Sequence, residues 1–470
     1  MSKDLIKSRF APSPTGDMHP GNLRTALFNW LYAQKHHGVF LLRIEDTDQA
    51  RGSEASLQGL LQVLTTLNLG WGEGPEADKG NGPYKQSERA DIYKQYYDKL
   101  IDLGRAYPCY CSDTELAIAR KTQLAQGHAP KYSGKCRELN DAARAALAAE
   151  GRVPTLRFKI QPEDNISFQD LVKGEQVFKG SDLGDFIIRR EDLSATFLFC
   201  NAIDDSLMGV THALRGDDHL SNTPRQLLIL NALGLRTPHY GHVPLILGDD
   251  GAPLSKRNGS MSVENLLEQG FFPIVILNYL GRLGHHIEAQ TLLTLDELAA
   301  QFELTHIARS AARFDKAQLL HWQKMAVQQA SLAEIEKWLD GKIDSAWGVQ
   351  EKDKAKLIEL VRQNGVLYQD VAVLMSALFG EVQHEPEAVT VLQQTEVGFY
   401  KAAEESLVHF PDWKAMTQFI KDKTGKNGKA LFAPLRAALM GALHGPEMAE
   451  LIQIMGKERV TARFQAAQQR

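Results

Sequence analysis

Cysteine is scarce in this sequence, with four residues among 470. So few thiols cannot form the disulfide framework that stabilises small secreted domains. Long apolar runs are also missing, because the longest one, 271–280, is interrupted by Pro273 and Asn278 and is too short to cross a bilayer. The N-terminal residues lack the apolar core of a signal peptide. We therefore expect a cytoplasmic protein with no membrane partner.

An excess of positive charge is missing as well. Lys and Arg total 53 against 58 for Asp and Glu, which gives a formal net charge of −5. The overall field therefore does not favour nucleic acid, and any contact with it depends on local patches of Lys and Arg. The length is too great for one hydrophobic core and indicates several domains.

The most informative stretch, 9–22, joins an apolar segment to an amphipathic one through a turn rich in Pro and Gly. Residues 5–10 and 39–44 are typical of buried strands, and the residues between them have helical periodicity. This order predicts a parallel crossover. A helix N-terminus suits an anion such as phosphate. His19 and Gly21 stand there, and His19 is either a phosphate donor or a solvated histidine in a capping turn.

Loop-rich sequence interrupts this alternation after residue 108, and strands and helices alternate again near residue 200. Strand-like pieces occur at 155–160, 185–189, 209–216 and 241–247. After about 260 the pattern is almost wholly helical. The sequence therefore predicts an α/β fold, with a Rossmann-type parallel nucleotide-binding sheet, an inserted α+β domain and an all-α C-terminal half. The expected segments are 1–108 and 200–252 for the sheet domain, 109–199 for the insertion, and 253–330 and 331–470 for the helical regions.

Several local signals refine this prediction. Ser87 is expected to cap a helix, and Cys200 is expected in a buried apolar strand. The pairs Thr294-x-x-Glu297 and Ser331-x-x-Glu334 fit capping boxes.

Charged residues follow the predicted strands. Arg9 and Arg215 could converge on one pocket, where two guanidinium groups would select a carboxylate, although either alone is more often a structural ion pair. Glu45 could bind an ammonium group or belong to a solvated acidic loop. Lys256, after a strand and a turn, could neutralise charge on ATP phosphates or lie in a solvated Lys-Arg turn.

Cys109, Cys111 and Cys136 lie in the predicted insertion. Three thiolates provide most of the tetrahedral ligand set that Zn²⁺ prefers. The fourth ligand could be Tyr132, Glu138 or, less readily, His128. Three reduced thiols without a metal remain the alternative.

Together these motifs closely resemble bacterial glutamyl-tRNA synthetases, which are class I aminoacyl-tRNA synthetases, over nearly the whole chain. One family signature is matched by Pro12-Ser-Pro-Thr-Gly16 with His19-Pro-Gly-Asn22, and the second by Leu254-Ser-Lys-Arg257. Further matching blocks are 42–48, 204–209, 214–226, 242–247 and 434–436.

The resemblance implies activation of L-glutamate by ATP with Mg²⁺, and transfer of glutamate to the 3′ end of tRNA-Glu, with tRNA-Gln as an open second substrate. It implies catalysis by His19, Gly21 and Lys256, and ATP binding by these residues with Asn22 and Arg257. The implied glutamate-binding residues are Arg9, Ala11, Ser13, Glu45, Phe197, Asn201 and Arg215. The insertion would hold the tRNA acceptor end, 253–330 would contact the stem, and 331–470 would read the anticodon. We expect a monomer.

The sequence departs from the family pattern at four positions. Pro20 replaces an aliphatic residue, and Pro253 replaces a lysine, which leaves Lys256 to supply more of the loop charge. Phe197 replaces a tyrosine of the glutamate pocket. Glu138 stands where a histidine ligand is usual, so Tyr132, as in the truncated glutamyl-queuosine relatives, is the preferred fourth ligand.

Three other functions agree less well with the sequence. Glutamyl-queuosine tRNA synthetases lack the helical half that residues 331–470 form here. Small nucleotidylyltransferases that share the His-x-Gly motif are far shorter. A catalytically silent tRNA-binding paralogue is supported only by Pro253 and Phe197.

Overall fold

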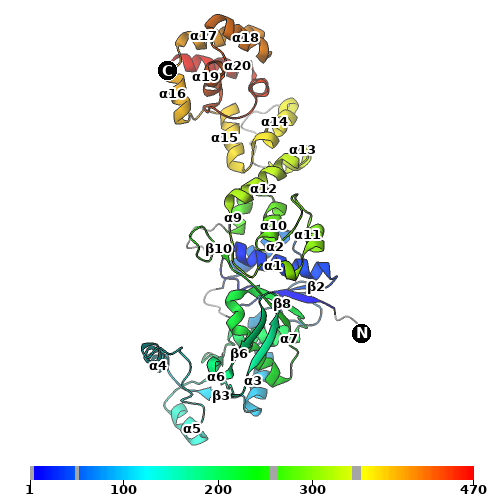
Figure 1. Cartoon of the computed structure of the whole chain (residues 1–470), viewed down its shortest axis with the longest axis vertical. Coiled ribbons are helices and arrows are strands. Elements are labelled where there is room, and N and C mark those ends of the chain that lie inside the picture. Colours follow the sequence, from blue (N-terminus) through cyan, green and yellow to red (C-terminus); the bar gives the residue numbers. More distant parts are fainter. Residues whose placement is uncertain (1–4, 48–51, 255–261, 341–350) are drawn as a thin grey trace. The chain divides into compact units, whose positions relative to one another are not determined.

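The computed structural model describes residues 5–47, 52–254, 262–340 and 351–470, which form two compact units (Figure 1). The first unit comprises Met1–Asn265 and Ile276–Asp315, and the second comprises Leu266–Val275 and Lys316–Arg470. In the described residues, no helix is both long and apolar enough to cross a membrane.

The first unit is built on a four-stranded parallel sheet with the strand order β2-β1-β8-β9. Its strands are β1 (Lys7–Phe10), β2 (Val39–Leu42), β8 (His212–Gly216) and β9 (His239–Val243). In the register, Arg9 lies beside Leu41 and Arg215 lies beside His242. Because all four strands are parallel, these residues approach the same carboxyl edge of the sheet, which is where ligands bind in open α/β sheets.

Helix α1 (Pro20–Lys35) joins β1 to β2 and completes the predicted parallel crossover. Most of its residues are buried, including Leu23, Leu27 and Leu31. Pro20 lies in the first turn, where its fixed φ suits a helix and its missing N–H removes no helical hydrogen bond. The other helices of the sheet domain are α2 (Glu54–Thr66), η1 (Gln86–Glu88), α3 (Ala90–Asp102), α7 (Phe197–Leu207), η2 (Asp217–Asn222) and α8 (Thr223–Leu233).

The segment between α3 and α7 has a different architecture. Strands β3 (Ala106–Cys109), β4 (Thr155–Phe158) and β7 (Phe186–Arg189) form an antiparallel sheet, and β5 (Ile166–Asp170) and β6 (Gly174–Phe178) form a hairpin. The segment also contains α4 (Asp113–Ala125), α5 (Asp141–Ala149) and α6 (Gly180–Leu183). The hairpin approaches the parallel sheet, since the Leu171 N–H donates to the Tyr240 carbonyl at 2.9 Å. This arrangement confirms the predicted α+β insertion into a parallel sheet.

The remaining chain is mostly helical, as predicted. Between β9 and residue 315 it forms β10 (Ile246–Leu247), α9 (Val263–Glu268), α10 (Pro273–Arg282), α11 (Leu295–Gln301), η4 (Leu304–His306) and β11 (Ala312–Arg313). Later elements are α12 (Lys316–Gln329), α13 (Leu332–Trp338), α14 (Glu351–Asn364), α15 (Tyr368–Phe379), α16 (Pro386–Gln394), α17 (Val397–Glu405), η6 (Ser406–His409), α18 (Trp413–Thr424), α19 (Lys429–Met440) and α20 (Met448–Gln468).

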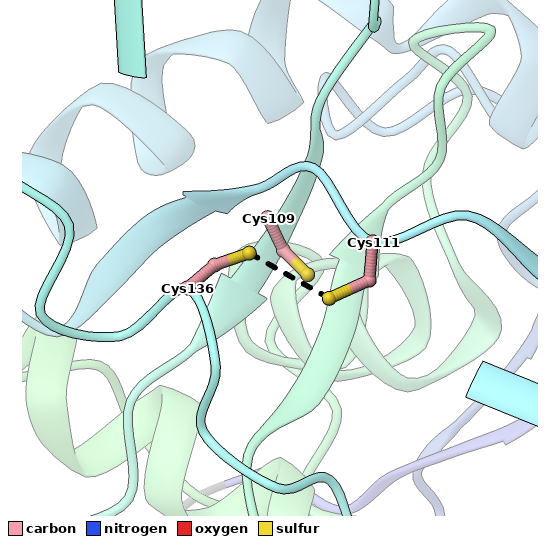
Figure 2. Close-up of side chains that lie close together, drawn as sticks. All are labelled: Cys109, Cys111 and Cys136. Atoms are coloured by element: carbon pink, nitrogen blue, oxygen red, sulfur yellow. Dashed lines mark hydrogen bonds between the residues drawn. The ribbon is translucent and has the colours of Figure 1, made fainter. Parts of the chain in front are cut away.

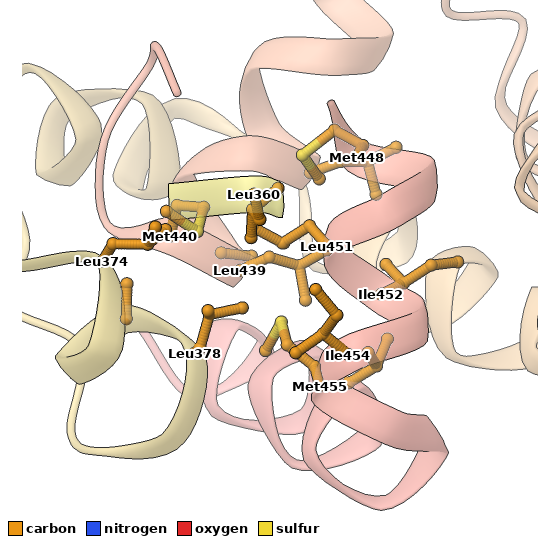
Figure 3. Close-up of a cluster of buried hydrophobic side chains, with 14 of the residues drawn as sticks. Leu360, Leu374, Leu378, Leu439, Met440, Met448, Leu451, Ile452, Ile454 and Met455 are labelled. Atoms are coloured by element: carbon orange, nitrogen blue, oxygen red, sulfur yellow. The ribbon is translucent and has the colours of Figure 1, made fainter. Parts of the chain in front are cut away.

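Leucine, isoleucine and methionine side chains fill the core of the second unit. Figure 3 shows Leu374 and Leu378 from α15 packed with Leu439 from α19 and Leu451 from α20. The capping boxes at Thr294 and Ser331 are both present, as the sequence predicted.

Three local predictions were wrong. Cys200 lies in helix α7 rather than in a strand, although it is buried, because a short apolar run suits a buried helix as well as a buried strand. Ser87 does not cap α3; its hydroxyl and N–H donate to the carboxylate of Asp46 at 2.6 and 2.8 Å. The stretch 241–247 is divided between two sheets instead of forming one strand. Pro244 lies between β9 and β10 and has no N–H to donate to a neighbouring strand.

Candidate functional site

A cavity of about 420 Å³ lies where β1 and β8 end and α1 begins. Ten residues that the sequence analysis selected line it: Arg9, Ala11, Ser13, His19, Gly21, Asn22, Glu45, Phe197, Asn201 and Arg215. Pro253 and Leu254 line it too, whereas Lys256 and Arg257 lie outside the described residues. The structure thus brings residues selected for amino-acid binding and residues selected for nucleotide binding to one cavity.

Arg9 forms a buried ion pair with Asp205 from α7. Nε of Arg9 lies 3.3 Å from Oδ1 of Asp205, and its Nη1 donates to the Leu214 carbonyl at 3.2 Å. The same carboxylate lies 2.6 Å from Nη1 of Arg43. Burial opposes ionisation of Asp205, but the two guanidinium groups overcome it and lower the pKa of this carboxyl. The positive charge of Arg9 is therefore partly neutralised within the protein.

Arg215 has a different environment. Its Nη2 donates to Oγ1 of Thr223 and to Oε1 of Gln226, both at 2.7 Å, and its Nε donates to Nε2 of His242 at 3.2 Å. Among the described residues, no carboxylate forms an ion pair with Arg215, which is 4% exposed. Burial lowers the pKa of Arg215 to about 10, so the group is still cationic at neutral pH. A buried cation held only by neutral acceptors at a cavity wall favours an anionic ligand.

Glu45 is a buried acidic group of the cavity, whose lining also includes Asp218. Its Oε1 accepts from Nδ2 of Asn201 at 2.5 Å and from Nη2 of Arg43 at 3.1 Å. Burial raises the pKa of Glu45, although Arg43 and Asn201 counter part of this effect. Glu45 is 6% exposed, so a solvated acidic loop does not describe this residue.

Asn201 links the acidic and basic groups. Its Nδ2 donates to Glu45, while its Oδ1 accepts from Nη1 of Arg215 at 3.5 Å. The carboxylate and the guanidinium therefore lie on either side of one carboxamide. This separation suits a small ligand that carries both an ammonium group and a carboxylate.

His19 caps helix α1, as in the capping turn that was one of the two alternatives raised from the sequence. Its Nδ1 accepts from the Gly21 N–H at 3.1 Å, so a neutral ring carries its proton on Nε2 as a donor. A Cβ atom on Gly21 would lie 3.2 Å from Nδ1 of His19, closer than ordinary contact. Glycine at this position thus permits the capping geometry at the start of α1.

Several residues that organise this cavity received no individual role from the sequence. Asp205 and Arg43 form the ion pairs behind Arg9, and His242, Thr223 and Gln226 hold Arg215. The two adjacent acids in the mostly apolar stretch 197–207 are a signal that could have identified Asp205.

A second group of chemically reactive side chains lies in the inserted segment. The buried sulfur atoms of Cys109, Cys111 and Cys136 all lie within 4.8 Å of one another and point toward a common centre (Figure 2). The hydroxyl of Tyr132 lies 3.3 Å from Sγ of Cys109 and 3.5 Å from Sγ of Cys111. Glu138 instead pairs with Lys159 at 3.1 Å, and its side chain is 79% exposed. The structure therefore brings three sulfur atoms and one phenolic oxygen together.

Comparisons with known proteins identify the family. Residues 5–321 match the catalytic domain of the class I tRNA synthetases described as E and Q, and residues 330–468 match an anticodon binding domain. The chain is 48% identical to glutamate–tRNA ligase 2 of Alkalilimnicola ehrlichii over 100% of its length and 99% of the relative. It is 47% identical to glutamate–tRNA ligase 2 of Nitrosococcus oceani over 99% of this chain and 98% of the relative.

A solved structure is similar over almost the whole chain. The crystal structure of a glutamate tRNA ligase from Elizabethkingia meningosepticum in complex with its amino acid has a TM-score of 0.85 and 26% identity, over 99% of each chain. These findings agree with the resemblance seen in the sequence motifs and with the class I fold around the cavity. The chain therefore belongs to the family of class I tRNA synthetases for glutamate and glutamine.

Proposed function

We propose that this protein is a glutamate–tRNA ligase, which activates L-glutamate with ATP and transfers it to the 3′ end of tRNA-Glu. The observation that carries the proposal is the cavity that combines a buried, uncompensated Arg215 with the N-terminus of α1. Relatives named glutamate–tRNA ligases, at 46–48% identity over nearly the full length, support the same conclusion.

The amino-acid substrate is recognised by opposite charges. Arg215, with Arg9 beside it in the cavity wall, offers guanidinium donors to a carboxylate of glutamate. Glu45 accepts from the ammonium group, and Asn201 holds the spacing between the two ends. Ala11, Ser13 and Phe197 complete this part of the wall.

ATP is bound at the start of α1. Phosphate oxygens can accept from the N–H groups of this helix, are attracted by its dipole, and can accept the Nε2 proton of His19. Gly21 and Asn22 allow the backbone to approach them closely. Lys256 and Arg257 are predicted to add positive charge from the loop that follows Leu254. Mg²⁺ accompanies ATP, as is general for this class of enzyme, and neutralises part of the phosphate charge.

The reaction needs no covalent link to the protein. The α-carboxylate of glutamate attacks the α-phosphorus of ATP, the bond to the β,γ-phosphates breaks, and pyrophosphate leaves with that electron pair. A terminal ribose hydroxyl of tRNA then loses its proton and attacks the activated carbonyl, and AMP leaves. Catalysis comes from positioning in the cavity and from stabilisation of phosphate charge by His19 and Lys256.

Other parts of the chain bind tRNA in this proposal. Residues 109–199 hold the acceptor end, 253–330 contact the stem, and 331–470 read the anticodon, in keeping with the anticodon binding domain matched at 330–468. That match argues against a glutamyl-queuosine enzyme, and the ten selected residues that line one cavity argue against a silent paralogue. The enzyme is proposed to act as a cytoplasmic monomer.

Aminoacylation of two transcripts tests this function. Purified protein is incubated with ATP, labelled glutamate and either tRNA-Glu or tRNA-Gln, and the charged tRNA is quantified. Charging of tRNA-Glu is expected, and the second transcript defines whether tRNA-Gln is also a substrate. Failure to charge either transcript with a folded protein contradicts the proposal.

We also propose that Cys109, Cys111, Cys136 and Tyr132 hold a structural Zn²⁺. A tetrahedral ion with Zn–S bonds of about 2.3 Å separates two sulfur atoms by about 3.8 Å, and a sulfur and an oxygen by about 3.5 Å. The observed separations are 3.6 Å between Cys111 and Cys136, and 3.3 and 3.5 Å from the Tyr132 hydroxyl to Cys109 and Cys111. The hydroxyl oxygen also accepts from the Cys136 N–H at 2.9 Å, which suits a phenolate ligand. Bound zinc would join β3 to the loop that contains Tyr132 and Cys136.

Metal analysis checks this site directly. Wild-type protein is expected to contain about one zinc per chain, and Cys109→Ser is expected to lose most of it, because a structural site needs all four ligands. Cys200→Ser is the matched control, since Cys200 lies in α7 and should leave the zinc content unchanged. Equal zinc in Cys109→Ser and wild type would exclude Cys109 as a ligand.

The Phe197→Tyr variant tests the one aromatic departure in the cavity. Phe197 lies on the cavity wall with its ring 5.1 Å from that of His219. Restoring a hydroxyl adds one hydrogen bond, worth about 0.5–1.5 kcal/mol, so KM for glutamate should fall about two- to tenfold. KM for ATP serves as the control and should not change. A KM for glutamate that rises would mean that the hydroxyl has no partner in this pocket.

A further inference from the structure

A buried chain of hydrogen bonds leads from the inserted segment to the guanidinium of Arg215. Asp170, the last residue of β5, has its Oδ2 2.5 Å from Nδ1 of His242, and His242 Nε2 lies 3.2 Å from Nε of Arg215. Asp170, His242 and Arg215 are 2%, 0% and 4% exposed. None of the residue roles given above uses Asp170, and His242 has appeared only as a neighbour of Arg215.

The direction of each hydrogen bond follows from the end groups. An ionised Asp170 can only accept, so Nδ1 of His242 carries the proton. Nε2 is then the unprotonated nitrogen and accepts from Nε of Arg215 at 3.2 Å and from the Thr223 hydroxyl at 2.9 Å. Asp170 therefore determines the tautomer of His242, in the way that a carboxylate orients a metal-binding or catalytic histidine.

Asp170 is itself firmly fixed. Its Oδ1 accepts from the N–H groups of Val172 at 2.9 Å, Lys173 at 2.7 Å and His242 at 3.2 Å. The hydrogen bonds to His242 and to these N–H groups overcome the effect of burial and lower the pKa of Asp170, which keeps it ionised. Both ends of the carboxylate thus have defined and different partners.

The imidazole spacer has an electrostatic consequence. A carboxylate in direct contact with Arg215 would neutralise it, as Asp205 does for Arg9. With His242 between them, Asp170 orients the guanidinium through a neutral acceptor and leaves its charge available at the cavity wall. Thr223 and Gln226, which are also neutral acceptors, have the same effect on Nη2.

We propose that Asp170 and His242 are positioning residues that fix the Arg215 guanidinium for a carboxylate of the amino-acid substrate. This inference rests on the proposed function, because it takes glutamate to be the ligand of Arg215. It assigns to the inserted segment, through β5, a part in building the amino-acid pocket.

The Asp170→Asn variant tests the tautomer. The amide oxygen can keep the backbone N–H contacts of Oδ1, whereas the amide NH₂ now donates to Nδ1 and moves the imidazole proton to Nε2. That proton then faces the Nε–H of Arg215 and Oγ1 of Thr223, which lies 2.9 Å from Nε2, so Arg215 loses the acceptor for its Nε–H. In glutamate-dependent ATP–pyrophosphate exchange with tRNA present, KM for glutamate should rise about tenfold or more, the order expected for a lost hydrogen bond to a charged group. KM for ATP and kcat should stay within about threefold, because the nucleotide end of the cavity is untouched.

Two further comparisons separate positioning from general destabilisation. Asp164→Asn makes the same chemical change in the inserted segment, where Asp164 accepts from Arg105 at 2.6 Å, and should leave KM for glutamate unchanged. His242→Gln retains an acceptor for Arg215 and should have a lower KM than His242→Leu, which has none. If Asp170→Asn fails to fold, this order of the two His242 variants decides the question.

The outcomes are distinct. If the wild type is active and Asp170→Asn has the same KM for glutamate as the wild type, the positioning role alone is overturned. The same holds if the two His242 variants have equal KM values for glutamate. A folded wild type that shows no glutamate-dependent exchange overturns the proposed function and this inference with it. A parallel rise in the KM for ATP also overturns it, because only the amino-acid pocket should be affected.

Discussion

Replacing Arg215 by glutamine is expected to raise KM for glutamate about a hundredfold, because a charge-assisted contact between a buried guanidinium and a carboxylate is lost. Arg215 is a buried guanidinium of the cavity wall that contacts no carboxylate among the described residues. Arg24 also lines the cavity without a carboxylate partner in this part of the chain, but its guanidinium donates to the backbone carbonyls of Leu283 and Pro244. KM for glutamate and for ATP would be measured by pyrophosphate exchange, and KM for ATP should change little.

Two variants control this experiment. Arg215→Lys keeps the charge but loses the planar fork, so its KM for glutamate should lie between wild type and Arg215→Gln. Arg225→Gln removes a neighbouring guanidinium on α8 that contacts the Ser221 and Leu183 carbonyls outside the cavity, and should leave KM for glutamate unchanged. A wild-type KM in Arg215→Gln would show that the carboxylate binds elsewhere.

Lys256→Ala should slow formation of the adenylate about 10²–10³-fold, the cost of removing one group that stabilises developing charge. This prediction comes from the sequence, since Lys256 lies outside the described residues, although Leu254, two positions earlier, lines the cavity. Pro253 occupies the position of a family lysine, so Lys256 is predicted to supply more of the loop charge here. Single-turnover rates with saturating glutamate and ATP measure the effect.

Two controls for the Lys256 experiment are the affinity for glutamate and a variant that keeps the positive charge. Glutamate affinity should be nearly unchanged in Lys256→Ala, because the lysine is proposed to act on ATP. Lys256→Arg preserves the cation and should recover part of the rate. An adenylate rate in Lys256→Ala equal to wild type would refute the assigned role.

The main outline of the site could be predicted from local sequence. The stretch 9–22 has a strand, a turn and a helix in direct succession, with His19 as the helix cap and Gly21 in the first turn of the helix. Neighbouring residues therefore determine the shape of the helix end that is proposed to bind phosphate. Because residues at the ends of parallel strands meet at the carboxyl edge of the sheet, the proximity of Arg9 and Arg215 could be predicted without knowledge of any side-chain contact.

The difference between the two arginines could not be predicted in this way. Asp205, which partly neutralises Arg9, is 196 positions away along the chain, and Asp170 is 72 positions from His242. Such pairs depend on how separate segments meet in the folded protein. The prediction of a strand at Cys200 was wrong for a local reason, because a few apolar residues do not distinguish a buried helix from a buried strand.

The most direct measurement is ATP–pyrophosphate exchange with glutamate, glutamine or aspartate as the amino acid, each with tRNA-Glu present. Arg215 should favour glutamate strongly over glutamine, because a neutral amide leaves the buried guanidinium without an anion. Aspartate, one methylene shorter, should not reach both Glu45 and Arg215 and should support little exchange. Exchange with glutamate alone is the predicted result. Exchange with glutamine that is as fast as with glutamate or faster would contradict a pocket for an acidic amino acid, and so would the absence of exchange with glutamate by folded protein.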